Sequence, residues 1–123
     1  MTVPQHLQYT ADHEWLSLEG DLATVGITAF AADALGDIVF VELFDEGTPV
    51  TSGSPCGELE STKSVSDFLA PIDGVVVAVN EDVLEDPGLV NSDPYGSWLV
   101  RIRVEDSPAL LDAVAYTAII SEA

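Results

Sequence analysis

The residue whose type and position most clearly indicate chemistry is Lys63, the only lysine in the chain. It stands between two short runs typical of strands, 56–60 and 65–69, so we predict that it lies at the tip of a β-hairpin. Such a tip presents a side chain outward, and the lysine amine is a nucleophile on a flexible stem that can be acylated. We therefore predict that an enzyme reading the turn, rather than a linear sequence, modifies Lys63. The alternative is that Lys63 only balances charge on an acidic surface.

The other reactive residue types do not form a catalytic or metal-binding set. The two histidines, His6 and His13, lie near the N-terminus without a second group of ligands at metal spacing. Cys56 is the only cysteine and has no neighbouring base or cation, so we expect a small buried side chain rather than a nucleophile. The sequence also lacks a phosphate-binding glycine loop, a Gly-x-Ser-x-Gly motif and the ligand order of an EF-hand. We therefore expect a protein that is not an enzyme and holds no metal.

The elements that must position Lys63 are mostly strands, because apolar and polar residues alternate in short runs. Strands are predicted at 13–18, 22–27, 38–43, 56–60, 65–69, 75–79 and 97–104, with a further extended piece at Pro49 and Val50. Helical segments are predicted at 29–35, between an N-cap at Thr28 and Gly36, and at 81–86.

A C-terminal helix is predicted from about 107 to 121, with Ser107 as its N-cap and Pro108 at its first position. The residues expected on its buried face are Leu110, Leu111, Val114, Ala118 and Ile119.

A weak internal repeat occurs at an offset of 40 residues, where Val39, Val50, Ser52 and Leu59 match Val79, Val90, Ser92 and Leu99. Periodic valines also match by chance, so both interpretations stay open. If the repeat is real, two units too small to bury their own apolar faces would form a sandwich around one core. We predict one domain, 1–123, that is mainly β: a small antiparallel β-sandwich or flattened barrel of two quasi-repeated sheets, with short helices and a core at about 7–104.

Charge excludes several classes of partner. Three basic residues stand against 22 acidic ones, giving a net charge of −19, which disfavours nucleic acid and an anionic membrane surface. The hydrophobic fraction of 47% and mean hydropathy of +0.28 nevertheless favour a folded chain over a disordered one. The apolar stretches are too short to span a membrane, and residues 1–6 do not resemble a targeting peptide. We expect a cytoplasmic monomer.

Motifs around Lys63 and along the chain resemble one family. The stretch Glu60-Ser-Thr-Lys-Ser-Val-Ser-Asp67, followed by Ala70-Pro-Ile-Asp-Gly74, resembles the lipoyl-attachment hairpin of glycine cleavage system H proteins. The further segments that resemble the family, in its order, are 13–16, 25–28, 35–43, 79–80, 89–91 and 93–95. The departures are Thr62 and Ser64 beside the lysine, Asp12 where the family often has Ser, and a loop before Trp98 that is one residue shorter.

The resemblance implies a lipoyl-domain-like fold and a carrier of lipoate, joined as an amide to Lys63. It implies four kinds of partner: the pyridoxal-phosphate glycine decarboxylase (P protein), the aminomethyltransferase (T protein), dihydrolipoamide dehydrogenase (L protein), and a lipoate ligase or octanoyltransferase. In the family the amine-loaded arm folds back into a cleft on the carrier. Glu14 and Asp67 match positions that line this cleft, where a carboxylate could pair with the amine. The alternative for both is ordinary surface acidity.

Other carriers remain as alternatives. Biotin carriers also place their lysine on a hairpin, but with Met on both sides, which Thr62 and Ser64 do not match. A lipoyl domain of a 2-oxoacid dehydrogenase would be part of a longer chain and would lack the C-terminal helix. The remaining alternatives are a lipoyl relay that donates its group to other proteins, a carrier for another modification, and an unmodified acidic interaction module.

Overall fold

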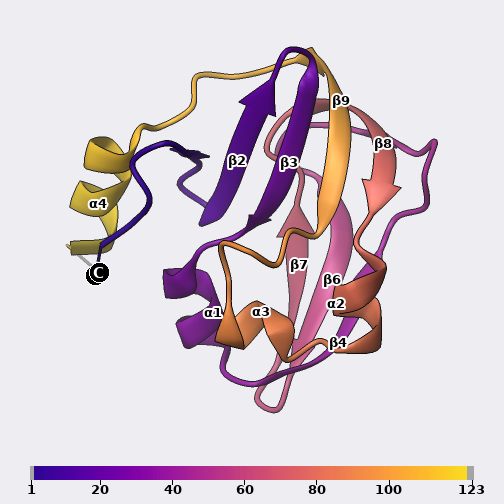
Figure 1. Cartoon of the computed structure of the whole chain (residues 1–123), viewed down its shortest axis with the longest axis vertical. Coiled ribbons are helices and arrows are strands. Elements are labelled where there is room, and N and C mark those ends of the chain that lie inside the picture. Colours follow the sequence, from indigo (N-terminus) through magenta and orange to yellow (C-terminus); the bar gives the residue numbers. More distant parts are fainter. Residues whose placement is uncertain (1, 122–123) are drawn as a thin grey trace.

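The computed structural model describes residues 2–121 as strands with four short helices (Figure 1). The strands are β1 (Gln8–Tyr9), β2 (Glu14–Glu19), β3 (Leu22–Ile27), β4 (Ile38–Leu43), β5 (Pro49–Val50), β6 (Pro55–Ser61), β7 (Val65–Leu69), β8 (Asp73–Val79) and β9 (Val100–Asp106). The helices are α1 (Ala29–Leu35), α2 (Glu81–Glu85), α3 (Leu89–Ser92) and α4 (Ala113–Ser121).

These strands form two antiparallel sheets, which confirms the predicted β-sandwich. The larger has the order β1-β2-β3-β9-β8-β5 and the smaller the order β4-β6-β7. Both sheets contribute to one core, to which β3 supplies Val25, β6 Leu59, β7 Phe68 and β9 Ile102. The β2–β3 turn lies at one end of the molecule and the β6–β7 turn at the other (Figure 1). The hairpin that carries Lys63 is therefore anchored in the core and projects from one end.

Helix α1 begins and ends as its sequence predicts. The Thr28 Oγ1 accepts a hydrogen bond from the Ala31 N–H at 3.2 Å, so Thr28 is the N-cap. Gly36 ends the helix with a φ of +85° and donates its N–H to the Ala32 carbonyl. This left-handed backbone is open to glycine at little cost, which explains why the helix stops there.

The C-terminal helix starts later than predicted. Strand β9 continues to Asp106, and the following segment stays extended because Tyr9 and Leu111 exchange two backbone hydrogen bonds of 2.8 Å. Helix α4 begins only at Ala113, where the Asp112 Oδ1 accepts the Ala115 N–H at 2.8 Å. Ser107 is therefore not the N-cap.

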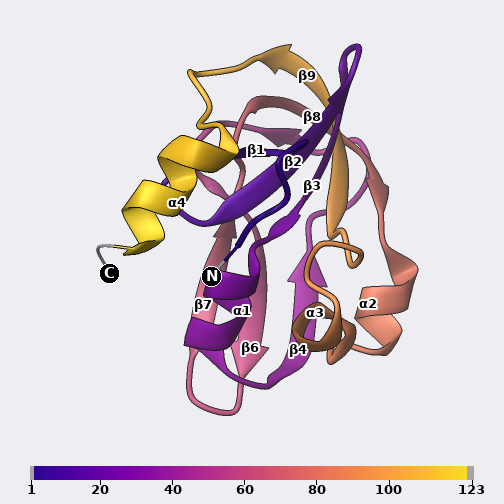
Figure 2. The same cartoon turned by 60° about the vertical axis from the view of Figure 1, so that its left-hand side comes forward.

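The buried face of α4 also differs from the prediction. It consists of Ala113, Tyr116 and Ile120, whereas Val114 is 73% exposed. These three residues pack with Tyr9 and Trp15 in a second apolar cluster, and α4 lies beside β1 and β2 (Figure 2). Of the other residues predicted for this face, Ala118 is exposed, Ile119 is half-buried, and Leu110 and Leu111 precede the helix.

The proposed 40-residue correspondence is wrong in detail. Val50 lies in strand β5, whereas its match Val90 lies in helix α3, which the sequence pattern did not predict. The larger sheet also combines strands from both ends of the chain, so the two sheets are not two successive halves of the sequence. In the described part of the chain, no helix has the length and apolar character needed to cross a membrane.

Candidate functional site

Lys63 lies, exposed, in the three-residue turn between β6 and β7, as predicted. The turn is closed by a hydrogen bond from the Ser61 N–H to the Ser64 carbonyl at 2.8 Å. The Ser61 Oγ accepts the N–H groups of both Lys63 and Ser64 at 3.1 Å. Ser61 is itself buried, so its hydroxyl fixes the backbone under the lysine from inside the hairpin. The amine is thereby presented on a defined turn rather than on a loose loop.

A pocket of about 180 Å³ opens between α1 and the β6–β7 hairpin. Its lining is mostly apolar and includes three acidic side chains. The apolar lining residues include Ile27, Ala31, Ala34, Leu35, Leu59 and Phe68, and the acidic ones are Asp12, Glu14 and Asp67. The structure thus brings Glu14 and Asp67, which lie far apart in the sequence, to the same pocket. An apolar lining that also holds carboxylates suits an extended aliphatic group that ends in a cation.

Glu14 is the more deeply placed of the two carboxylates, with only 4% of its surface exposed. Its Oε1 accepts a hydrogen bond from the Thr10 Oγ1 at 2.8 Å. Burial raises the pKa of Glu14 to about 7; the Thr10 bond opposes that rise and the negative charge of Asp12 adds to it. Near neutral pH this carboxyl is poised between its two forms, so a cation in the pocket would draw it into the ionised one.

Asp67 lies on the exposed side of β7, where it pairs across the sheet with Glu58. It borders the pocket and also a neighbouring hollow that includes Glu42 and Glu58. Its exposure means that water screens its charge more than that of Glu14. Glu14 is therefore the stronger candidate for holding a cation.

Comparison with known proteins identifies the family. A model of the family described as Glycine cleavage H-protein matches residues 7–123. The chain belongs to this family. Members are lipoyl carriers of the glycine cleavage system and are not themselves catalysts, and this is the role of the present chain.

The relatives match over nearly the whole chain. It is 56% identical to the glycine cleavage system H protein of Clavibacter sepedonicus, covering 99% of this chain and 100% of that protein. It is 57% identical to the one of Streptomyces coelicolor, covering 96% and 97%. The crystal structure of a glycine cleavage system H protein from Mycobacterium marinum superposes with a TM-score of 0.92 at 43% identity, covering 97% and 99%.

Hydrogen bonds that the sequence pattern did not predict connect the C-terminal helix to the segment that precedes Glu14. The Tyr116 hydroxyl, from α4, is hydrogen bonded to the Thr28 Oγ1 at 2.7 Å and to the His13 Nδ1 at 2.9 Å. His13 has a φ of +72°, uncommon for a residue with a side chain, and directly precedes Glu14. The C-terminal helix thus holds the bend from which Glu14 enters the pocket.

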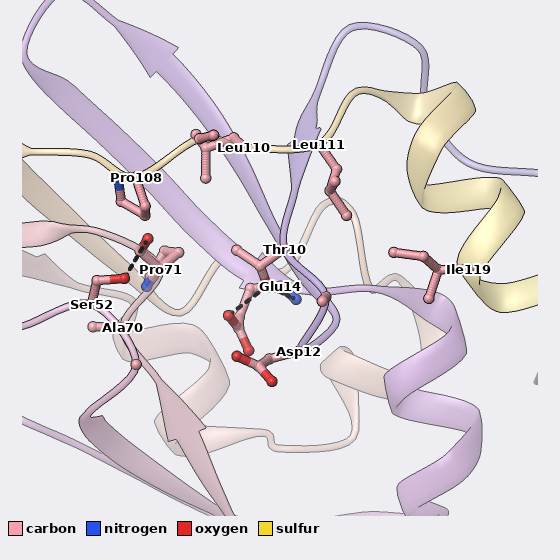
Figure 3. A pocket seen from close by; sticks show the side chains of 13 residues that line it. Thr10, Asp12, Glu14, Ser52, Ala70, Pro71, Pro108, Leu110, Leu111 and Ile119 are labelled. Carbon is pink, nitrogen blue, oxygen red and sulfur yellow. Dashed lines mark hydrogen bonds between the residues drawn. The ribbon is translucent and has the colours of Figure 1, made fainter.

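Glu14 also borders a second hollow of about 240 Å³, whose lining includes Thr10 and Asp12 (Figure 3). Figure 3 shows the carboxylates of Asp12 and Glu14 near each other, with Pro71, Pro108 and Leu110 around the hollow. The negative charge of Asp12 is one of the causes of the raised pKa of Glu14.

Cys56 is fully buried in the core, as predicted, and burial raises the pKa of its thiol to about 12. A buried thiol with a raised pKa is poorly suited to act as a nucleophile at neutral pH. Within residues 2–121, no group of three or more His, Cys, Asp and Glu side chains is arranged to bind a metal ion.

Proposed function

We propose that Lys63 carries the lipoyl group of this carrier, as an amide on Nζ, and that the pocket at Glu14 and Asp67 receives the loaded end of the arm. The observation that carries the proposal is that the only lysine stands on a hydrogen-bonded turn of the hairpin that lines a largely apolar pocket with a buried carboxylate. Members of the family carry lipoate, and the residues present are suited to holding it.

The attached group supplies a disulfide at the end of a long flexible arm. Amide formation removes the positive charge of Lys63 and leaves an apolar chain that the pocket lining can bury. Tethering keeps the carried group at high effective concentration near each site that it visits. The role of the protein is therefore to present the arm on a fixed turn and to shelter it between visits.

The pocket would distinguish the loaded arm from the empty one by charge. A carried aminomethyl group has a primary amine that is protonated near neutral pH, whereas the oxidised disulfide bears no charge. Glu14, in its ionised form, would accept a charge-assisted hydrogen bond from the ammonium, with Asp67 adding a weaker attraction. Docking in the apolar pocket would limit contact of the carried group with water.

The partners proposed for this carrier are the enzymes of glycine cleavage. Glycine decarboxylase (P protein) would load the aminomethyl group, the aminomethyltransferase (T protein) would pass its methylene to tetrahydrofolate with release of ammonia, and dihydrolipoamide dehydrogenase (L protein) would reoxidise the dithiol. A lipoate ligase or octanoyltransferase would modify Lys63. We further propose that the carrier acts as a cytoplasmic monomer without nucleic acid or membrane partners.

Attachment is tested by incubating the protein with lipoate, ATP and a lipoate ligase that is active on a control carrier. We expect one lipoyl group by intact mass, and peptide sequencing should locate it on Lys63. Lys63→Arg should fold normally and gain no mass, because a guanidinium is a poor acyl acceptor at neutral pH. A lipoyl group on the N-terminal amine, or none on the parent protein, would refute the proposal.

A further inference from the structure

Helix α3 places one side chain, Asn91, where it binds two backbone groups of a distant segment. The Asn91 Nδ2 donates to the Gly36 carbonyl at 2.8 Å, and the Asn91 Oδ1 accepts the Ile38 N–H at 2.8 Å. Both ends of the amide are used, so its orientation is set by the contacts. Asn91 therefore holds the short connection from α1 to β4 in one conformation.

The same connection supports the lysine turn. The Thr62 N–H donates to the Asp37 carbonyl at 3.1 Å, and Ile38 pairs with Ser61 across the β4–β6 ladder. The segment 36–38 thus lies between Asn91 on one side and the turn that carries Lys63 on the other. A change in its conformation would move the backbone on which the lysine stands.

Gly36 is also in contact with the lysine side chain. A Cβ added to Gly36 would lie 2.7 Å from the Lys63 Cε, which is closer than van der Waals contact allows, and 3.4 Å from its Nζ. At Gly20, where φ is also positive, an added Cβ would meet nothing within 4 Å. The space over Gly36 is therefore filled by the lysine stem, which lies along the bare backbone at the end of α1.

This contact gives the lysine stem a direction. Leu35, Ala34 and Ala31, on the helix that Gly36 ends, all line the pocket that contains Glu14 and Asp67. A stem that lies on Gly36 is thus next to the α1 wall of that pocket. If a side chain at position 36 displaced the Lys63 side chain, the attached arm would begin farther from this wall.

We propose that Gly36 is a positioning residue for the lipoyl arm: its missing side chain lets the Lys63 stem lie against the end of α1 and directs the arm into the pocket, while Asn91 holds Gly36 in place. The inference rests on the proposed attachment of lipoate to Lys63. The competing explanation is that Gly36 is needed only for its positive φ, as at many helix ends. The two explanations differ in what a substitution does to the arm.

The first measurement concerns the unmodified parent protein. Because Lys63 is the only lysine, ¹³C-lysine labels a single residue, and its Hε protons can be tested for a nuclear Overhauser effect to the Gly36 Hα protons. The contact predicts this effect in the bare protein, whether or not lipoate is attached later. Its absence would overturn the inference.

The second measurement compares the lipoylated parent with Gly36→Ala, Asn91→Asp and Gly20→Ala. Aspartate keeps the acceptor for the Ile38 N–H but has no hydrogen to give the Gly36 carbonyl, and Gly20→Ala controls for an alanine at positive φ. We expect all four to accept lipoate at similar rates. After loading with the aminomethyl group, Gly36→Ala and Asn91→Asp should lose it about fourfold faster than the parent, which corresponds to about 0.8 kcal/mol or one methylene no longer buried.

The outcomes separate the hypotheses. A loaded Gly36→Ala carrier that lasts as long as the parent and Gly20→Ala would overturn the positioning role. If Gly36→Ala does not fold, the lifetime of Asn91→Asp and the Overhauser effect decide, and failure of either overturns the inference. Failure of the parent to gain lipoate on Lys63 would instead refute the proposed function, and is recognised by mass before any lifetime is measured.

Discussion

Replacing Glu14 by glutamine keeps the size of a buried side chain and removes its negative charge. In the loaded carrier, the charged form of Glu14 is the one that can pair with the ammonium of the carried group. Losing one charge-assisted hydrogen bond in a nearly buried site costs about 1–2 kcal/mol, so the loaded Glu14→Gln variant should decay roughly 5- to 30-fold faster than the parent. Glu14 is only 4% exposed, which is why little of this energy is lost to screening by water.

In the empty carrier, by contrast, the Glu14→Gln substitution should stabilise the fold at neutral and higher pH. Burial raises the pKa of Glu14 from 4.5 to about 7, so the folded state binds this proton more tightly than the unfolded chain does. The resulting stability is complete below about pH 4.5 and is lost as the pH rises to about 7, a loss on the order of 3 kcal/mol. Above that pH the empty Glu14→Gln variant should therefore unfold at a higher temperature than the parent, and below it the difference should shrink.

Two assays test the predicted shorter lifetime of the loaded variant and the predicted higher stability of the empty one. Decay of the loaded carrier is followed by mass in the absence of tetrahydrofolate, and thermal unfolding of the empty carrier is followed from pH 4 to 9. Glu105→Gln, at an exposed position at the end of β9, controls for the loss of one negative charge, and Asp67→Asn tests the exposed carboxylate that borders the pocket. Equal loaded lifetimes for the parent, Glu14→Gln and Asp67→Asn would mean that these carboxylates do not hold the arm. Parallel pH curves would refute the raised pKa.

Two further predictions concern the C-terminal helix. Tyr116→Phe removes the hydroxyl bonded to His13 and Thr28 and should lower the free energy of unfolding by about 1–3 kcal/mol, measured by urea denaturation. It should also shorten the lifetime of the loaded carrier, and an unchanged lifetime would show that α4 stabilises the fold without holding the Glu14 bend. Asp112→Ala should cost about 1 kcal/mol through loss of the α4 cap, whereas Ser107→Ala should cost almost nothing; the reverse order would contradict the observed start of α4.

Local signals in the sequence were sufficient for the elements that carry the lysine. The hairpin around Lys63 and the helix between Thr28 and Gly36 depend on hydrogen bonds and backbone preferences among residues that are near neighbours in the chain. Strand alternation likewise depends on which neighbouring side chains are apolar. For this reason the two-sheet class, the exposed lysine and the buried Cys56 could all be predicted correctly without coordinates.

Only the tertiary structure decided three features: the start of α4, the two hydrogen bonds of Asn91 and the raised pKa of Glu14. Leu111 stays extended because Tyr9, about a hundred residues earlier, pairs with it. Asn91 binds the segment after α1 because α3 packs beside the end of that helix, a contact that residues near Asn91 in the sequence do not predict. Glu14 and Asp67 meet at one pocket because β2 and β7, which belong to different sheets, both contribute to its lining together with α1. Contacts between distant segments depend on how the whole chain packs, and burial, which sets the acidity of Glu14, exists only after that packing is complete.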